Sequence, residues 1–208
     1  MYRNFFKRFF DFIFSLSGLI ILSPVIILVS IVLAVVNKGA GVFFYQLRPG
    51  ENELLFKVVK FKSMTEECDS NGNLLSNSER LTKFGKFIRA TSIDELPQLF
   101  NIVRGDMSFI GPRPLLIRYL PFYTQTERKR HSVRPGITGL AQINGRNLID
   151  WDTRLALDVQ YVENLSFWSD IIIVFKTIRN VLTAKDIVID TKQDLQDLDI
   201  ERQNRKQK

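Results

Sequence analysis

Residues 12–36 read FIFSLSGLIILSPVIILVSIVLAVV, and no charged residue occurs between Asp11 and Lys38. At about 1.5 Å of rise per residue, a helix of this length matches the roughly 30 Å hydrocarbon core of a bilayer. The apolar run is too long for a secretory signal peptide, and no clear small-residue cleavage site follows it. The stretch therefore predicts a helix that lies in a membrane.

Two features favour a re-entrant helix within residues 1–38. Pro24 of the Ser23-Pro24 pair cannot donate a backbone hydrogen bond to Ile20, so the helix should break there, with the Ser23 hydroxyl as a replacement donor. The positive-inside rule would also place both flanks of the run in the cytoplasm, because both are basic. The flanking basic residues are Arg3, Lys7, Arg8, Lys38, Arg48, Lys57, Lys60 and Lys62. We expect a helix-break-helix at Ser23-Pro24, and a simple spanning helix is the alternative.

The rest of the chain predicts an α+β fold. Segments 42–47 and 54–61 are rich in β-branched and aromatic residues and flank a Pro49-Gly50 turn signal, so they predict a short β-hairpin. Apolar residues at helical spacing predict the helices 79–89, 92–103, 115–130, 152–164 and 170–183.

The predicted helix 170–183 is strongly apolar on one face. It can pack in the core, or it can lie at the membrane interface with Trp168 at headgroup level. We therefore expect a small, mostly helical cytoplasmic globule at 39–190 with interfacial amphipathic helices. Residues 191–208 should form a polar, flexible tail.

Composition limits the chemistry that is available. The formal net charge is +7, which indicates an anionic partner such as nucleic acid, an anionic membrane face or a phosphorylated substrate. Cys68 is the only cysteine, so neither an intramolecular disulfide nor a cysteine-based metal cluster can form. His131 is the only histidine, which excludes a histidine-rich zinc site. No serine elbow lies near it, and we interpret it as structural.

Asp94 and Glu95 have two explanations. Ser92-Ile93-Asp94-Glu95 matches the S-x-x-E capping box of a helix start, where the helix dipole also favours acidic residues. Pro97 fits a helix capped by Asp94 better than one capped by Ser92, because it then falls where no backbone partner is needed. Alternatively, a carboxylate in this position can attack phosphorus, provided that cations screen the repulsion between the two anions.

Several basic residues could supply those cations. Each one alone is most simply a solvated surface charge, except Arg113, whose backbone is fixed by prolines on both sides. The planar guanidinium of arginine suits bidentate phosphate contacts. The candidates are Lys60, Lys62, Arg89, Arg113, Arg134 and Arg146. Gly136, Gly139 and Gly145 allow close backbone approach to a nucleotide, although no P-loop or G-x-G-x-x-G pattern is present.

These residues belong to a series of motifs that occur in one order. The motifs are Lys7-Arg8-Phe9-Phe10-Asp11, Ser23-Pro24, Lys60-Phe61-Lys62-Ser63-Met64, Asp94-Glu95-Leu96-Pro97-Gln98-Leu99 with Asn101, Gly105-Asp106-Met107-Ser108, Gly111-Pro112-Arg113-Pro114, Arg134-Pro135-Gly136-Ile137-Thr138-Gly139, Ala141-Gln142 and Gly145-Arg146. With them, the chain resembles the monotopic phosphoglycosyl transferases, the bacterial sugar transferase family, as far as about residue 185. Within the family it looks most similar to the bacillosamine-phosphate transferases of bacterial protein glycosylation.

The resemblance implies an enzyme of the bacterial inner membrane with Mg²⁺ and an active site facing the cytoplasm. Asp94 would attack the β-phosphorus of a UDP-sugar, expel UMP and hold the phosphosugar covalently. Polyprenyl (undecaprenyl) phosphate would then take the phosphosugar, in the first step of membrane glycoconjugate assembly. Glu95 would act as a base toward the lipid phosphate or organise the site. Asp94 would also bind the metal, and substrate contacts would come from Lys60, Arg89, Arg113, Arg134, Gln142 and Arg146.

The resemblance suggests UDP-diacetylbacillosamine as the donor, while other N-acetylated sugars and simple hexoses remain open. The family often has arginine in place of Lys62 and tryptophan in place of Leu140. Two other classes compete with the enzyme. A membrane-anchored basic adaptor for nucleic acid would fit the charge, but no nucleic-acid-binding motif occurs, and we expect no nucleic-acid partner. An aspartyl-phosphate phosphatase would need a D-x-D-x-T type of signature, which is absent around Asp94. The oligomeric state is not predicted.

Overall fold

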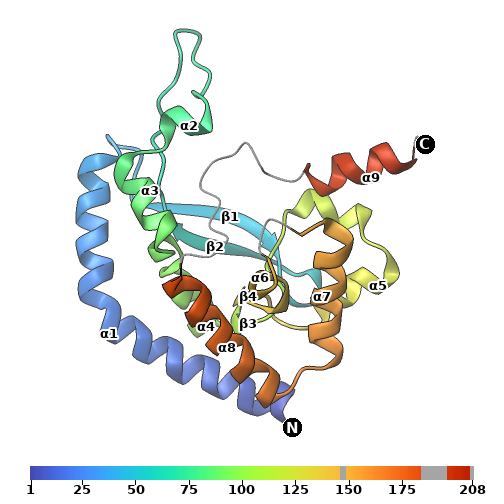
Figure 1. Ribbon diagram of the computed structural model, residues 1–208. Helices are drawn as coiled ribbons and strands as arrows, with labels where there is room; N and C mark the ends of the chain where they lie inside the picture. The colour runs from blue at the N-terminus through green and yellow to red at the C-terminus, as the bar shows by residue number, and fades with distance from the viewer. Residues whose placement is uncertain (146–148, 184–195, 207–208) are drawn as a thin grey trace.

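The computed structural model describes residues 1–145, 149–183 and 196–206. The apolar stretch forms one long helix, α1 (Lys7–Val36), after a short π-helical turn, η1 (Tyr2–Phe6). By length and composition, α1 could cross a membrane. Figure 1 shows α1 as a bent helix. Pro24 lies inside it, and Oγ of Ser23 donates to the carbonyl of Ile20 at 2.8 Å. The expected break is therefore a bend in a continuous helix, because the Ser23 hydroxyl replaces the donor that Pro24 lacks.

One side of α1 packs against the globule at both of its ends. Near its start, Nζ of Lys7 lies 2.7 Å from Oδ2 of Asp170. Just after its end, Nδ2 of Asn37 donates to the carbonyl of Lys62 at 2.7 Å, and Leu33 is fully buried. The other side is exposed and apolar, with Phe12, Ile13, Phe14, Leu16, Ile20, Ile21, Val25, Ile27, Leu28, Ile31 and Val35.

The predicted hairpin is confirmed. Strand β1 (Phe43–Pro49) pairs antiparallel with β2 (Leu55–Phe61), and a short 3₁₀ turn, η2 (Glu51–Glu53), connects them. The pairing begins at Pro49 opposite Leu55, so the Pro49-Gly50 signal does mark the end of the first strand.

The next two predicted helices begin and end at other residues. The prediction 79–89 is split into α2 (Asn77–Arg80) and α3 (Lys83–Ala90), because the Thr82 side chain accepts from Gly85 N–H and starts a new helix. The prediction 92–103 becomes a 3₁₀ turn, η3 (Ile93–Glu95), followed by α4 (Gln98–Arg104). Ser92 has a left-handed backbone with φ of 57°, which turns the chain away from a regular helix.

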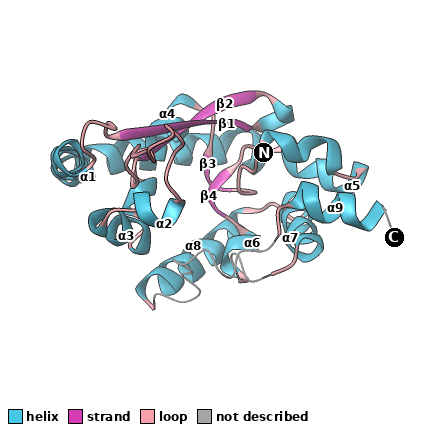
Figure 2. Cartoon of the chain, turned by 90° about the horizontal axis from the view of Figure 1, so that it is seen from above, coloured by secondary structure: helices cyan, strands magenta, loops and turns pink. Residues whose placement is uncertain are grey.

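A small parallel sheet, which the sequence does not predict, lies near the centre of the globule in both overall views (Figure 1, Figure 2). It pairs β3 (Ser108–Ile110) with β4 (Gly136–Thr138). A Cβ at Gly136 would lie 2.1 Å from the backbone nitrogen of Gly111, so only glycine allows this approach.

The predicted helix 115–130 is instead three short turns, η4 (Ile117–Phe122), α5 (Gln125–Arg128) and η5 (Lys129–Ser132). Pro121 lies within η4, and a capping box at Thr124 begins a new turn. Both features prevent one continuous helix.

The last predicted helices are confirmed as α7 (Trp151–Glu163) and α8 (Phe167–Leu182), which follow the one-turn helix α6 (Leu140–Ile143). Ile173 of α8 is buried in the core. The opposite face of α8 exposes Phe167, Trp168, Ile172, Phe175, Ile178 and Val181. One face of α8 therefore fits packing in the core, and the other fits a position at the membrane interface.

The tail differs from the expectation of a flexible segment. Residues 198–206 form helix α9 (Leu198–Lys206), with Leu198 fully buried in a cluster with Tyr119 and Trp151. Arg202 pairs with Glu127 and with Asp152, each at 2.7 Å. Local polarity suggests a tail, but one buried leucine and a set of ion pairs hold this segment. Residues 184–195, where the predicted boundary falls, lie outside the described ranges.

Candidate active site

Asp94 and Glu95 lie in η3, between α3 and α4. Ser92 makes no side-chain capping hydrogen bond, and the helix that follows starts only at Gln98. The side chain of Glu95 does not return to the backbone of Ser92 but reaches two cations. The capping-box explanation of Asp94 and Glu95, called the dyad below, is therefore wrong, because the left-handed Ser92 removes the geometry that a capping box needs.

Glu95 is held by two ion pairs. Its Oε1 lies 2.6 Å from Nζ of Lys60 and 3.0 Å from an Nη of Arg113. Burial acts to raise the pKa of Glu95, but Arg113 and Lys60 outweigh burial and lower it to about 2. Glu95 is therefore an ionised carboxylate that fixes the positions of two cations.

Asp94 differs from its neighbour. It accepts no hydrogen bond from any side chain or backbone group in the described part of the chain, and it is only partly exposed. Burial raises the pKa of Asp94 above its usual value, and Glu95 adds to this, while Lys60, Arg113 and Arg89 act in the opposite direction. One carboxylate is thus committed to cations and the other is available to react, a division typical of paired catalytic carboxylates.

Lys60 is positioned through the edge of β2. Asn101 of α4 is 1% exposed, and its side chain bonds to this edge like a neighbouring strand. Its Nδ2 donates to the carbonyl of Lys57 at 2.7 Å, and its Oδ1 accepts from Val59 N–H at 3.0 Å. Because Asp94 and Glu95 lie just before α4, this pair of hydrogen bonds sets the position of Glu95 relative to Lys60.

The backbone of Arg113 is held by the buried ion pair of Arg130 and Asp158. Arg130, 2% exposed, donates to the carbonyl of Arg113 at 2.6 Å and to Oδ2 of Asp158 at 2.8 Å. The two prolines that flank Arg113 restrict its backbone further. The Arg113 side chain is 46% exposed, so its remaining donors can meet a bound anion.

Arg89 reaches the site from the last turn of α3. Its Nε donates to Oγ of Ser63 at 2.8 Å. Gly85 brings α3 against the segment after β2, since a Cβ there would lie 1.9 Å from the carbonyl oxygen of Ser63. Lys62, in the same segment, pairs with Glu66 and donates to the carbonyl of Ala40.

Arg134 and Gln142 form no hydrogen bond or ion pair with Asp94 or Glu95 in the part of the chain that the structure describes. Arg134 donates to the carbonyl of Gly105, beyond the far end of α4, and lies 3.5 Å from Glu51. Both polar atoms of the Gln142 side chain are buried with no partner among the described residues. Arg146 lies outside the described ranges.

Sequence reasoning missed three contributors. Arg48 of β1 was counted only as a basic flank, yet burial and the charge of Arg113 lower its pKa to about 10, which places another guanidinium near Arg113. Arg130 and Asp158 carry no signal of their own in the sequence, since each is one charged residue within a predicted helix, 115–130 and 152–164. The prolines that flank Arg113 predicted a rigid loop, but they gave no indication of which residues hold that loop.

His131 agrees with its structural interpretation. It is 5% exposed and packs on the ring of Tyr123, and burial together with Arg130 and Arg128 lowers its pKa to about 3. It is therefore neutral at physiological pH.

The described residues could supply only few ligands to a metal ion. In the ranges that the structure describes, no three His, Cys, Asp or Glu side chains gather closely enough to bind a metal by themselves. Mg²⁺ is commonly bound by one or two carboxylates together with substrate phosphates. The partner-free carboxylate of Asp94 fits that pattern, because its oxygens are not used by the protein.

The chain belongs to the bacterial sugar transferase family, whose model matches residues 2–184. EpsL of Bacillus subtilis, named as an uncharacterized sugar transferase, is 51% identical over 181 residues, which cover 87% of this chain and 89% of EpsL.

Two longer relatives carry activities in their names. The undecaprenyl-phosphate galactose phosphotransferase of Salmonella typhimurium is 40% identical over 86% of this chain and 41% of its own length. The UDP-glucose:undecaprenyl-phosphate glucose-1-phosphate transferase of Klebsiella pneumoniae is 42% identical over 83% of this chain and 39% of its own length. The chain thus spans about two-fifths of these two relatives.

Proposed function

We propose that this protein transfers a sugar 1-phosphate from a UDP-sugar to undecaprenyl phosphate through a covalent intermediate on Asp94. An oxygen of Asp94 attacks the β-phosphorus, and the bond from that phosphorus to the bridging oxygen breaks, so the electron pair and the oxygen leave with UMP. A phosphate oxygen of the lipid then attacks the same phosphorus. The acyl-phosphate bond breaks, Asp94 is regenerated, and the product is an undecaprenyl diphosphate sugar.

The observation that carries the proposal is the contrast within the dyad. Glu95 binds Lys60 and Arg113, whereas Asp94 has no hydrogen-bond partner among the described residues and lies among the same cations. A nucleophile must be free to reach phosphorus, and the cations around it must screen its charge from the diphosphate. We assign Glu95 the role of organiser of Lys60 and Arg113.

We propose that the first step requires Mg²⁺, which the carboxylate of Asp94 would hold together with phosphate groups of the substrate. A bound Mg²⁺ would supply neutralisation of the negative charge on the diphosphate and on the departing UMP. UMP release should stop in excess chelator and return with added Mg²⁺. Undiminished release in chelator would remove the ion from the mechanism.

We propose that α1 enters the cytoplasmic face of the inner membrane and returns to it. Lys7 and Asn37, at the two ends of α1, both bond to the same globule, which supports a re-entrant helix over a straight spanning one. The exposed apolar faces of α1 and α8 then form the membrane-facing surface. Cysteines placed at Arg3 and at Lys38 should both be protected from a membrane-impermeant label in intact cells, and labelling at position 3 alone would indicate a spanning helix.

We propose a hexose as the transferred sugar. The names of the two longer relatives described above state galactose and glucose, and neither name supports the amino sugar suggested by the family resemblance. The purified protein with undecaprenyl phosphate and Mg²⁺ should release UMP faster with UDP-galactose or UDP-glucose than with UDP-diacetylbacillosamine. The reverse order would restore the amino sugar, and no release with any donor would refute the proposed activity.

A further inference from the structure

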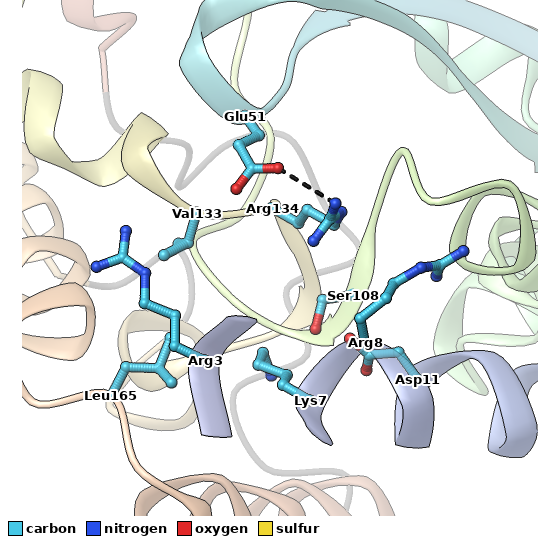
Figure 3. A pocket seen from close by; sticks show the side chains of 9 residues that line it. All are labelled: Arg3, Lys7, Arg8, Asp11, Glu51, Ser108, Val133, Arg134 and Leu165. Atoms are coloured by element: carbon cyan, nitrogen blue, oxygen red, sulfur yellow. Dashed lines mark ion pairs between the residues drawn. The ribbon is translucent and has the colours of Figure 1, made fainter. Parts of the chain in front are cut away.

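A second charged site lies away from the dyad, at the start of α1. A cavity of about 240 Å³ opens between the first turns of α1, the segment Val133–Arg134 and Ser108. Figure 3 shows the side chains of Arg3, Arg8 and Arg134 around it, with Ser108 between them. None of its lining residues forms a hydrogen bond or ion pair with Asp94 or Glu95 among the described residues.

The hydrogen bonds of the arginines leave this cavity positively charged. Arg3 donates to the carbonyl of Ser132 at 2.7 Å, and Arg8 donates to the carbonyls of Ile102 and Val103 at 2.5 and 2.8 Å. These are neutral acceptors, and in the described part of the chain neither arginine forms an ion pair.

The acidic groups nearby offset this charge only in part. The acid nearest to Arg134 is Glu51 at 3.5 Å, and Oδ1 of Asp11 accepts from Phe109 N–H at 3.1 Å. Lys7 is neutralised separately by Asp170. An anion in the cavity would therefore meet the guanidinium groups of Arg3 and Arg8. The carboxylates of Asp11, which also lines the cavity, and of Asp106 offset the charge of Arg8 in part.

Size and position distinguish this site from the reacting centre. Arg134 and Arg8 bind carbonyls at the C-terminal end of α4, whereas the dyad precedes its first residue. Seven helical residues at about 1.5 Å each separate the two places by about 10 Å. The cavity is also smaller than the roughly 300–1,000 Å³ typical of pockets for drug-sized ligands, which suits a headgroup better than a nucleotide sugar.

The surroundings point to a lipid as the source of the anion. Phe5, Phe9 and Phe12 line a neighbouring hollow together with Arg8, and Phe5 and Phe9 are 62% and 50% exposed. Trp168 of α8 is 72% exposed and contacts Phe167, which in turn packs on the ring of Tyr2. Aromatic side chains beside arginines are typical of the headgroup level of a membrane.

We propose that this cavity binds the phosphate headgroup of an anionic membrane phospholipid, separately from the acceptor lipid of the reaction. The bound phosphate fixes the start of α1 against the loop at Val133–Arg134 and holds the helix at a defined depth. The inference uses the membrane placement of α1 proposed above, but not the chemistry of the dyad.

Lipid binding can be measured without turnover. The full-length protein in neutral detergent is titrated with dioctanoyl phosphatidylglycerol, and the rise in Tm gives the half-saturating concentration. Arg3→Gln should raise that concentration about five-fold, since it removes a charge-assisted phosphate contact from an exposed side chain. Lys38→Gln is the matched control, because it removes the same charge at the other end of α1 and should bind as the wild type does.

Three outcomes would overturn the proposal. Equal half-saturation of wild type and Arg3→Gln would mean that the cavity is not the binding site. An equal rise in Tm with dioctanoyl phosphatidylcholine would mean that the negative charge is not recognised. An equal rise with inorganic phosphate at the same concentration would mean a site for a free anion and not for a lipid. Because none of these readouts involves UMP, failure here is distinguishable from failure of the proposed activity.

Discussion

Asn101→Ala tests whether the position of the dyad is set by the edge of β2. The substitution removes the acceptor of Val59 N–H and the donor to the carbonyl of Lys57. Leaving buried backbone groups without partners costs about 1–3 kcal/mol each. The carbonyl of the exposed residue Lys57 can partly recover a bond to water, so we expect a total loss of about 2–4 kcal/mol. Because stability is typically about 5–15 kcal/mol, the variant should still fold.

At roughly 3 °C per kcal/mol for a domain of this size, the Tm of Asn101→Ala should fall by about 6–12 °C. UMP release at a temperature where the variant remains folded should fall as well, because Lys60 and Glu95 lose their fixed relation. Asn77→Ala is the matched control. Among the described residues its side chain accepts a single hydrogen bond, from Arg80 on the surface, and its Tm should stay within about 2 °C of the wild type. Equal Tm values for the two variants would refute the positioning role of Asn101.

Three further predictions concern the charges of the site. Arg113→Lys should lower kcat/KM for UMP release about tenfold or more although the charge is kept, since an ammonium cannot bind Glu95 and a phosphate as a planar fork does; wild-type kinetics would return Arg113 to a surface charge. The rate of UMP release should fall as the pH drops through the raised pKa of Asp94, because the protonated acid cannot attack. Glu95 has a pKa of about 2, so its protonation should not lower the rate further above pH 2. A pH-independent rate down to pH 4 would contradict this. Asp158→Asn should destabilise the fold by about 3–5 kcal/mol, measured by denaturant unfolding, because it leaves buried Arg130 without its counter-charge; a loss below about 1 kcal/mol would contradict it.

Local signals in the sequence predicted the elements that short-range chemistry determines. The apolar run predicted α1, and Pro49-Gly50 predicted the hairpin, because both depend on residues close together in the chain. The bend at Pro24 and the hydrogen bond of Ser23 to Ile20 follow directly from the missing N–H of proline.

Long-range contacts account for what the sequence could not predict. The pairing of β3 with β4 joins three-residue strands that are far apart in the chain, and such short strands carry no periodic pattern. The left-handed backbone of Ser92 gave no signal, because serine is not a residue that usually adopts it. Arg134 begins the motif Arg134-Pro135-Gly136-Ile137-Thr138-Gly139, and the resemblance implied that it binds substrate, yet its guanidinium bonds to Gly105 at the far end of α4.

Intact-protein mass spectrometry can show whether Asp94 carries the phosphosugar. Wild type, Asp94→Asn and Glu95→Gln are mixed with UDP-galactose or UDP-glucose and Mg²⁺, without lipid. Asp94 has no hydrogen-bond partner among the described residues, so its replacement should leave the fold intact, which an unchanged Tm would verify. We predict UMP release and an adduct of one hexose phosphate on Asp94 in the wild type, and neither in Asp94→Asn. An adduct on Glu95, or UMP release by Asp94→Asn at the wild-type rate, would contradict the account.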